Sequence, residues 1–419
     1  MSDKTPLRRT VARHGQLRSP GPVSQLLKII GIVLAVVLVS GVGVAAYVGT
    51  TLLNTVAENS VDLEGQESVP PDIGAYKGGF NMLLVGVDAC EPEYAEMFGK
   101  RCEDRDGDAT LNDTNLLVHV SDAPRRVTVV SIPRDTMLAI PSCTDEEGNT
   151  HSAMSKQPLN SAWEYGGLNC VAQTVTELTG QDIQYAASVT WGGVIEITNA
   201  IGGVEVCLAS GIKDKATGLD MEAGNHTIQG YEALQFLRTR KGVGDGSDLG
   251  RIGNQQQYMS SLARKMLSSE VLGDVGTMLK LADTAVNNLT TSSTLTPMTI
   301  AQIALALKDV PTSDIVFVQY PTATDPDDAN KVVPSWEAAG ELFAAIEANQ
   351  PLEITHENNE NEGVVVEEAP TTEEPVEPVE PTETATPAPD ASETAVALPD
   401  SIKGNSAAQQ TCSNGNVKD

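Results

Sequence analysis

Histidine and aromatic residues are scarce in this chain, and several catalytic motifs are missing from it. Of its 419 residues, five are histidine, and aromatic residues make up 4%. No CxxC or clustered Cys/His pattern occurs, which argues against a zinc site. The motifs G-x-S-x-G and H-E-x-x-H and the P-loop are also absent, so the enzyme classes that they define have no support. The histidines are scattered and favour no histidine-based catalysis: His14, His119, His151, His226 and His356.

Basic residues are also few, and they are unevenly distributed. The chain has 27 Lys and Arg against 57 Asp and Glu, a net charge of -30, with no Lys or Arg between Glu353 and Asp400. Because an acidic protein repels phosphate backbones, nucleic acid is not an expected partner. Glutamate recurs among Pro and Thr in the C-terminal part, so residues 353–419 are predicted to form a disordered acidic tail.

The N-terminal part has the charge pattern of a membrane anchor. Residues 1–28 hold six cations and one acid, and the run Ile29–Gly49 that follows carries no charge. A helix needs about 20 such residues to cross a bilayer, and basic residues stay on the cytoplasmic side. We therefore predict a cytoplasmic segment at 1–28, a single transmembrane helix at 29–53 and an extracellular stalk at 54–79.

A cleaved signal peptide is the competing interpretation, because Val44–Ala46 places small residues near the end of the apolar run. The run is longer than the roughly 7–15 residues of a typical signal peptide, which favours an uncleaved anchor in the cell membrane. The folded domain is then expected outside the cell.

The cysteines agree with an extracellular location, where disulfides persist. Cys90 with Cys102 would close one loop, and Cys143 with Cys170 could close a second. Cys207 and Cys412 either pair or stay free. All six cysteines follow the predicted anchor: Cys90, Cys102, Cys143, Cys170, Cys207 and Cys412.

Strand and helix patterns alternate between residues 80 and 352 without a regular βαβ rhythm. This predicts an α/β domain with a mixed central sheet and helices on both faces. A turn signal at Asp122–Arg125 predicts a hairpin between two of the strands. Short apolar runs predict strands at 81–87, 115–120, 127–132, 204–208 and 315–319. Helical spacing predicts helices at 168–178, 193–200, 230–236, 248–267, 275–287, 299–307 and 336–348.

One stretch, Phe236–Gln257, concentrates cations and glycines in this acidic chain. Arg238 and Arg240 share a face only in extended backbone, so two arginines on one anion require the preceding helix to end near Phe236. Gly242, Gly244 and Gly246 then lead into a predicted helix, on which Asp248, Arg251 and Gln255 share a face. A glycine loop before a helix N-terminus favours an anion. A solvated surface loop with incidental charges is the alternative.

Carboxylates at strand ends form a second candidate cluster. Asp88 ends the first predicted strand, Asp113 precedes the second, and Arg134-Asp135 follows the third. Two carboxylates near a phosphate site suit Mg²⁺. Acids at strand ends can equally be turn residues, and that alternative stays open for each of them alone.

These residues stand in an order that resembles the LytR-CpsA-Psr family, strongly over residues 80–267 and weakly to about 352. The matching motifs are Leu84-Val-Gly-Val-Asp88, Asp113-Thr114, Ser131-Ile-Pro-Arg-Asp135, Leu159-Asn-Ser-Ala-Trp-Glu-Tyr-Gly-Gly167, Ile201-Gly-Gly-Val204, Gly230-Tyr-Glu-Ala-Leu234, Arg238-x-Arg240 and Asp248-x-x-Arg251-x-x-x-Gln255.

The resemblance implies a phosphotransferase that moves a glycopolymer from an undecaprenyl-pyrophosphate carrier to peptidoglycan, or in some members to a surface protein. It implies Mg²⁺ on Asp88 and Asp113, with Asp248 orienting an arginine or acting near the metal. Asp88 or Asp135 would take the acceptor's proton. The implied pyrophosphate ligands are Arg134, Arg238, Arg240, Arg251 and Gln255.

The chain departs from the family pattern at two places, and other functions remain open. Leu111-Asn112 and Asn254 stand where the family often has a cation, so affinity or specificity for the lipid head group is expected to differ. The alternatives are a lipid-pyrophosphate hydrolase and a non-catalytic envelope regulator or wall-binding protein.

Overall fold

A computed structural model describes residues 60–61, 76–98, 102, 110–145, 147–246, 248–268, 271, 281, 283–285, 287–356, 363–366 and 395–416. The predicted cytoplasmic segment, the predicted transmembrane helix and most of the predicted stalk lie outside these residues. Within the described part, no helix combines the length and the apolar character needed to cross a bilayer.

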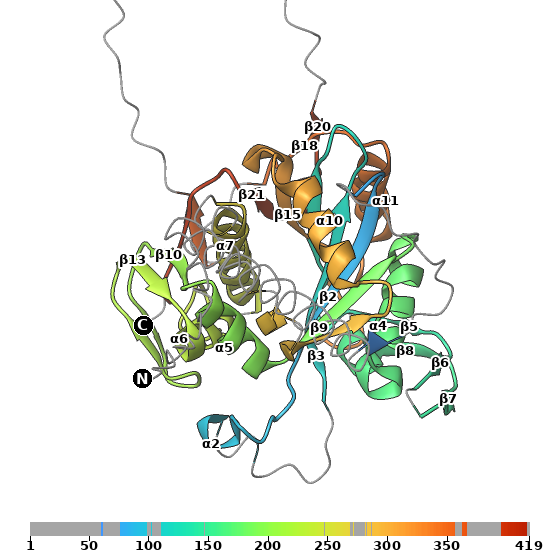
Figure 1. Ribbon diagram of the computed structural model, residues 1–419, viewed down its shortest axis with the longest axis horizontal. Coiled ribbons are helices and arrows are strands. Elements are labelled where there is room, and N and C mark those ends of the chain that lie inside the picture. The colour runs from blue at the N-terminus through green and yellow to red at the C-terminus, as the bar shows by residue number, and fades with distance from the viewer. Residues whose placement is uncertain are drawn as a thin grey trace, which may run out of the picture. The chain divides into compact units, whose positions relative to one another are not determined.

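A mixed eight-stranded sheet forms the centre of the domain (Figure 1). Its neighbouring strands pair both ways, since β2 runs parallel to β9 and antiparallel to β3. The predicted mixed α/β sheet is therefore confirmed, as is the hairpin at Asp122–Arg125, which joins β3 to β4. In spatial order the strands are β1 (Ser60–Val61), β14 (Leu289–Ser292), β9 (Tyr185–Val189), β2 (Phe80–Val87), β3 (Asn112–Val120), β4 (Val127–Ser131), β15 (Ile315–Gln319) and β21 (Gly404–Ser406).

Alternation along the strands gives the sheet two buried faces. On β2, Leu83 and Val85 pack into one apolar cluster, while Phe80 and Leu84 pack into the other. Helices α4 (Ala162–Thr179) and α11 (Trp336–Glu347) cover the first face, and α7 (Asp248–Met266) and α10 (Pro297–Leu307) cover the second. Burial of each large apolar side chain stabilises the fold by roughly 1.5–3 kcal/mol.

Most predicted helices are present, with local signals at their ends. Helix α4 ends at Gly180, whose φ of 71° is the left-handed cap that the sequence predicts. The predicted helix at 275–287 lies largely outside the described residues. The remaining helices are α2 (Ala95–Phe98), α5 (Trp191–Ala200), α6 (Gly230–Arg238) and the short 3₁₀ turns Leu159–Ser161 and Thr312–Asp314.

Smaller strand groups extend the domain on both sides. A four-stranded sheet has the order β13 (Gly224–Ile228), β10 (Val204–Leu208), β22 (Thr411–Ser413) and β19 (Val364–Val366). Two-stranded pairs are β5 (Met137–Ile140) with β8 (Met154–Pro158), β6 (Cys143–Thr144) with β7 (Thr150–His151), β11 (Ile212–Asp214) with β12 (Leu219–Met221), β16 (Thr322–Thr324) with β17 (Val332–Pro334), and β18 (Leu352–Glu353) with β20 (Val396–Ala397).

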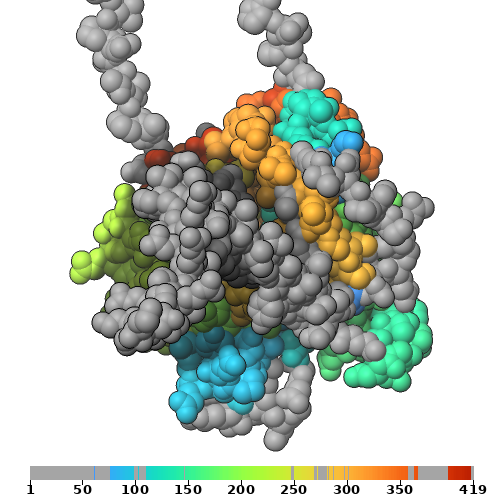
Figure 2. Space-filling model, viewed as in Figure 1, coloured from blue at the N-terminus to red at the C-terminus, as the bar shows by residue number. Residues whose placement is uncertain are grey.

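The C-terminal residues fold onto the domain, so the prediction of disorder throughout 353–419 is wrong. Strand β21 forms one edge of the central sheet by pairing with β15, and β22 pairs with both β10 and β19. Ile402 and Ala407 are fully buried. Figure 2 shows the C-terminal residues, in red, against the body of the domain.

The reason for this error is a change of composition within the predicted tail. The Glu, Pro and Thr bias is concentrated before residue 395, whereas apolar and small residues return after it. These later residues supply the side chains that are buried. Residues 357–362, 367–394 and 417–419 lie outside the described part of the chain.

Three disulfides join the described cysteines. Cys90–Cys102 and Cys143–Cys170 form as predicted. Cys207–Cys412, the pair that the sequence left open, links β10 to β22 across 205 residues. This third bond ties the C-terminal segment covalently to the domain.

Removal of the Cys207–Cys412 disulfide is predicted to lower the stability of the full chain. A cross-link across so long a loop restricts the unfolded chain and contributes about 2–5 kcal/mol. The Cys207→Ser/Cys412→Ser double variant should therefore unfold at a lower urea concentration than the wild type under non-reducing conditions. Equal midpoints for the two proteins would contradict this role.

Candidate functional site

A cavity of about 450 Å³ lies between the central sheet and helices α5, α6 and α7. Its walls are largely apolar and come from both the strands and the helices. Charged groups enter it from strand ends, from the end of α6 and from the first turns of α7. The apolar lining includes Leu84, Leu116, Val129, Ala187, Val189, Phe317, Val194, Ile197, Leu234, Leu237, Met259 and Leu262.

A β-bulge directs Asp113 into this cavity. Gly86 pairs with Thr114, but Val87 pairs with Asn112, so Asp113 is an extra residue in β3. As a result Asp113 and Thr114 both line the cavity, although neighbouring strand residues normally face opposite ways. The glycine fits this close approach, because a Cβ at Gly86 would lie 3.1 Å from the Thr114 Cβ.

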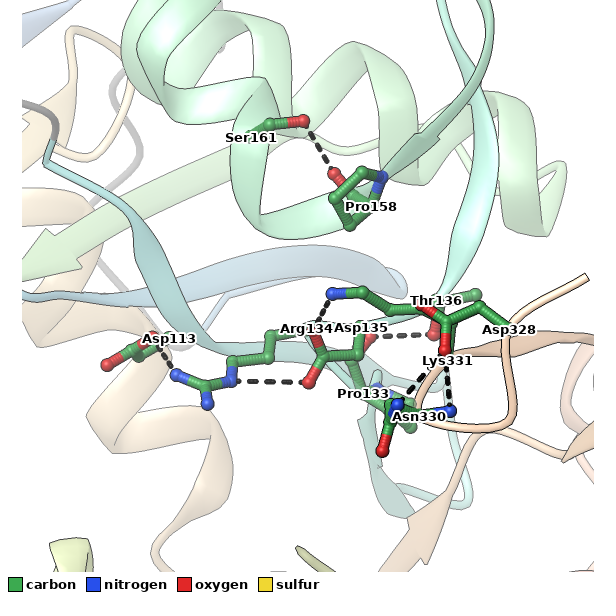
Figure 3. A network of polar contacts seen from close by, with 10 residues as sticks. All are labelled: Asp113, Pro133, Arg134, Asp135, Thr136, Pro158, Ser161, Asp328, Asn330 and Lys331. Atoms are coloured by element: carbon green, nitrogen blue, oxygen red, sulfur yellow. Dashed lines mark hydrogen bonds and ion pairs between the residues drawn. The ribbon is translucent and has the colours of Figure 1, made fainter. Parts of the chain in front are cut away.

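Arg134 meets Asp113 at the mouth of the cavity (Figure 3). Its guanidinium donates to Asp113 Oδ1 at 2.5 Å, and its Nε lies 3.6 Å from Asp135 Oδ2. A tight turn holds the Arg134 backbone, because the Thr136 hydroxyl donates to Pro133 O at 2.6 Å. The predicted meeting of Asp113 and Arg134 at adjacent strand ends is therefore confirmed.

Arg238 reaches the cavity from the last turn of α6, and its guanidinium carbon lies 4.0 Å from the centre of the Trp191 ring. Trp191, the first residue of α5, is itself buried and packs edge-on against Phe98. A cation over an indole face is attracted by the ring. Trp191 thus restricts where the Arg238 charge lies.

Arg240 does not join Arg238 in the cavity lining, which corrects the predicted pairing. Helix α6 continues to Arg238 instead of ending near Phe236, and Thr239 then adopts extended backbone with φ -62° and ψ 136°. The two arginines are therefore not on one extended face. Arg240 is exposed to solvent.

The loop after α6 binds an internal carboxylate. Asp214 Oδ2 accepts hydrogen bonds from the N–H groups of Arg240 at 3.0 Å and Gly242 at 3.4 Å, and from the Thr239 hydroxyl at 2.8 Å. Burial alone would raise the pKa of Asp214, but these donors outweigh it and hold the pKa below its usual value. The loop is thus built around a buried protein anion.

This arrangement corrects the prediction that the glycine loop binds a phosphate through its backbone. The Gly242 N–H donates to Asp214, the Gly244 N–H donates to Asn414 O, and the Gly246 N–H donates to Val243 O. The N–H of each of these glycines is thus already bonded within the protein. The positive groups at the cavity are therefore side chains.

Helix α7 places Arg251 and Gln255 in the cavity lining, as their spacing predicts. Gln255 Nε2 donates to Leu237 O at 3.0 Å, and Asn254 Nδ2 donates to Phe236 O at 2.7 Å. The two amides thus join α7 to the carboxyl end of α6. Asp248 is the first residue of α7, and its side chain lies outside the described part.

Asn254, one of the departures from the family pattern, has a structural role here. It is fully buried, and its Oδ1 accepts from the Ser413 hydroxyl at 2.5 Å. It does not belong to the cavity lining. Its position links α6, α7 and the C-terminal strand β22.

Asp88 lies at the same edge of the sheet but is buried. Its Oδ1 accepts from the Leu111 N–H at 2.7 Å, and its own N–H donates to Leu111 O. Asp113 is the one carboxylate among the described cavity-lining residues. One or two carboxylates with substrate phosphate oxygens fit Mg²⁺, so the donor set is compatible with the predicted ion. Among described residues, no cluster of three or more His, Cys, Asp or Glu side chains forms a metal site.

The charge of the cavity is opposite to that of the whole chain. Its described lining contains three arginines, Arg134, Arg238 and Arg251, against the single carboxylate of Asp113. Arginine presents a planar set of donors that matches two phosphate oxygens at once. An anion with an apolar tail therefore fits this cavity best.

Three contributors were not foreseen from the sequence. Trp191 is identifiable only by its ring contact with Arg238, Asp214 by its contacts with the loop, and Lys331 by its ion pair with Asp135. The sequence carries no local motif around them. Each lies far along the chain from the residue that it contacts.

Comparisons with known proteins show which proteins this chain is similar to. The LytR_cpsA_psr family model matches residues 46–349. Cell wall biosynthesis protein LcpA of Corynebacterium glutamicum is 28% identical over 317 residues, which cover 69% of this chain and 58% of that protein. The polyisoprenyl-teichoic acid–peptidoglycan teichoic acid transferase TagT of Bacillus subtilis is 27% identical, over 63% of this chain and 76% of its own length.

A solved structure supports the fold alone. Protein gbs0355 of Streptococcus agalactiae superposes with a TM-score of 0.50 and 22% identity, covering 65% of this chain and 87% of that one. The match to the corynebacterial LcpA spans less than two thirds of that relative's length.

Replacement of Asp214 by Asn is predicted to destabilise the protein in a pH-dependent way. Hydrogen bonds to a charged group contribute about 1.5–3 kcal/mol, so Asp214→Asn should lower the free energy of unfolding at pH 7 by about that amount. Because the folded-state pKa is lowered, the stabilisation is present above the unfolded-state pKa and is lost as the pH falls through the folded-state value. The difference in free energy of unfolding between wild type and variant, measured by urea unfolding, should therefore become smaller in acid.

Asp220→Asn is the matched control, because Asp220 pairs with Lys213 on the exposed surface of the neighbouring strands. That variant should unfold like the wild type at pH 7. If the difference in free energy of unfolding between wild type and Asp214→Asn stays constant down to pH 3, ionised Asp214 is not the source of the stabilisation.

Loss of the Trp191 ring is predicted to weaken the binding of an amphiphilic pyrophosphate. A cation–π contact contributes about 0.5–2 kcal/mol, so Trp191→Leu should raise the Kd for geranylgeranyl pyrophosphate roughly 3- to 30-fold in calorimetry. Trp191→Phe keeps an aromatic face, so its Kd should rise less than that of Trp191→Leu. Equal losses in both variants would show that ring volume, and not the contact with Arg238, matters.

Proposed function

The chain belongs to the LytR_cpsA_psr family, and from this premise we propose that it transfers a glycopolymer from an undecaprenyl-pyrophosphate carrier to peptidoglycan. The observation that carries the proposal is the cavity, which combines long apolar walls with three arginines. The relatives named as cell wall biosynthesis protein and teichoic acid transferase support the same class of reaction.

The apolar walls suit the polyprenyl chain of the carrier. The strands supply one wall and α5, α6 and α7 supply the other, so a chain between them would be covered from both sides. Each buried CH₂ group stabilises such a complex by roughly 0.8 kcal/mol. Most of the affinity for the carrier would come from this part of the cavity.

The arginines suit the pyrophosphate. Arg134, Arg238 and Arg251 enter the cavity from three different elements, and Gln255 adds an amide beside them. Phosphoryl transfer depends on positioning and charge neutralisation more than on a protein nucleophile. Arg240, which is exposed on the following loop, is not part of this set.

Asp113 and Asp88 would hold Mg²⁺ together with phosphate oxygens of the donor. When bound, the ion supplies further neutralisation of phosphate charge. The bulge that directs Asp113 into the cavity supports this assignment.

In the proposed reaction an acceptor hydroxyl attacks the phosphorus that carries the sugar. A new P–O bond forms, the bond from that phosphorus to the bridging oxygen breaks, and undecaprenyl phosphate leaves with the electron pair. The arginines stabilise the departing phosphate. Asp135 is the more open of the two carboxylates predicted to take the hydroxyl proton, since Asp88 is 2% exposed.

The proposed location is the outer face of the cell membrane, with residues 29–53 as a single anchor and the N-terminus in the cytoplasm. Three disulfides support an oxidising compartment for the domain. The substrate would then lie in the same membrane as the protein.

Hydrolysis of the lipid pyrophosphate is the second candidate function. The side chains of Arg134 and Asp113 at the mouth of the cavity are each about a quarter exposed, at 25% and 24%. Water therefore has access to the position where an acceptor hydroxyl would lie.

The test compares two arginines of the same short motif. With a labelled lipid-linked glycopolymer and peptidoglycan, Arg238→Ala in the full chain should lower kcat/KM for transfer by about 10²–10³, the scale for loss of a transition-state donor. Arg240→Ala should have a much smaller effect, because Arg240 lies outside the cavity lining.

The products distinguish the candidate functions. Label joined to peptidoglycan, or to a surface protein in the same assay, identifies the transferase and its acceptor. Release of free phosphorylated sugar, with no label joined to an acceptor, would identify the protein as a hydrolase. Absence of any turnover by the wild type would favour a non-catalytic wall protein, and equal losses in the two variants would refute the assignment of Arg238 to the cavity chemistry.

A further inference from the structure

We infer that Lys331 is a positioning residue for Arg134 and acts on it through Asp135. The inference rests on the proposed function, in which Arg134 binds the donor pyrophosphate. Lys331 comes from the segment between β16 and β17, 196 residues after Asp135. Figure 3 shows its amino group directed at the oxygen of the Asp135 carboxylate that does not face Arg134.

The four side chains form a row of alternating charge. Asp113 Oδ1 accepts from Arg134, the other side of the guanidinium faces Asp135 Oδ2, and Asp135 Oδ1 accepts from Lys331 Nζ. Their exposed fractions lie between 24% and 28%. Partial cover of this kind strengthens the interaction between charges compared with a pair in open solvent.

The backbone around Lys331 is fixed by its own hydrogen bonds. The Lys331 N–H donates to Asp328 O, and Lys331 O accepts from the Asp325 N–H, both at 2.9 Å. The next residue, Val332, donates its N–H to Asp135 O at 3.3 Å and pairs with Thr136. The segment is therefore bonded to the turn that carries Arg134, and these bonds fix where the Lys331 side chain begins.

Lys156 anchors the same segment from its far side. Its amino group lies 3.0 Å from Asp325 Oδ1 and 2.5 Å from Asp327 Oδ2, and Asp325 is buried. These contacts do not involve Asp135. The fixed segment and the ion pair with Asp135 can therefore be altered separately.

The charge balance explains why Lys331 matters for an anionic ligand. Asp113 and Asp135 balance the charges of Arg134 and Lys331. Without Lys331 the row would carry a net negative charge, and Asp135 would have Arg134 as its nearest cation. Both effects oppose the binding of pyrophosphate, the first by repulsion and the second by drawing the guanidinium toward Asp135.

The experiment measures binding and turnover in the full chain. Lys331→Met should raise the Kd for geranylgeranyl pyrophosphate, and the KM for the lipid-linked donor, about five- to tenfold, the scale of a partly covered ion pair. The kcat/KM should fall at least as far as the Kd rises, because Arg134 also stabilises the departing phosphate in the proposed reaction.

Two further variants separate this role from a general effect on folding. Lys331→Arg keeps the cation and should restore the Kd to within about twofold of the wild type. The Asp135→Asn/Lys331→Met double variant removes one charge of each sign, and it should bind the probe more tightly than Lys331→Met alone.

Lys308→Met is the matched control, because Lys308 pairs with Asp309 on the exposed surface after α10, at 3.8 Å. It removes the same charge and should leave the Kd unchanged. Thermal unfolding of each variant reports whether the fold is intact, and Lys331→Gln provides a second neutral substitution if Lys331→Met does not fold.

An unchanged Kd in Lys331→Met, or an equal loss in Lys308→Met, would overturn the inference. The proposed function is judged by a different result, since it fails if the wild type binds the probe but transfers no glycopolymer. Probe binding by the Lys331 variants still decides the positioning role in that case.

Discussion

Side chains of α7 donate hydrogen bonds to two of the last carbonyl groups of α6. The Asn254 amide donates to Phe236 O, and the Gln255 amide donates to Leu237 O. Both hydrogen bonds tie α7 to the end of α6 and favour the register in which the two helices meet. Arg238, at the end of α6, and Arg251, in the first turns of α7, thus line the same cavity.

The same joint explains why the C-terminal residues are part of the domain. Asn254 also accepts from Ser413 in β22, and Cys412 beside it is bonded to Cys207 in β10. The C-terminal strand is thus bonded both to this joint and to β10. Directional bonds of this kind add to the apolar contacts in fixing the positions of the helices that form the cavity walls.

The site also depends on keeping carboxylates away from the arginines or pairing them. Asp214 is turned toward the backbone of the loop after α6, Asp88 is bonded to Leu111, and Asp135 is shared with Lys331. Only Asp113, among the described lining residues, brings a negative charge into the cavity. An acidic protein can bind a pyrophosphate because its local field, and not its net charge, acts on the ligand.

Local patterns were sufficient for much of the architecture. The short apolar run at residues 81–87 and the helical spacing at 248–267 predict β2 and α7, because each pattern reflects how a single element is buried. The resemblance to known motifs brought Asp113, Arg134, Arg238, Arg251 and Gln255 forward, and these are the residues found around the cavity. The end of α6 was predicted two residues early, which was enough to misplace Arg240.

The sequence by itself determined the mixed sheet, most helices and the types of residue available for binding an anion, and it suggested two of the three disulfide pairs. The tertiary structure alone decided that Arg240 is exposed and that Asp214 accepts hydrogen bonds from the backbone of the glycine loop. It also decided that residues 395–416 belong to the fold and that Lys331 pairs with Asp135 next to Arg134. The physical reason is the distance along the chain over which the interactions act. Periodicity records how one element is buried, whereas these four features depend on hydrogen bonds and ion pairs between residues distant in the chain, which no local pattern encodes.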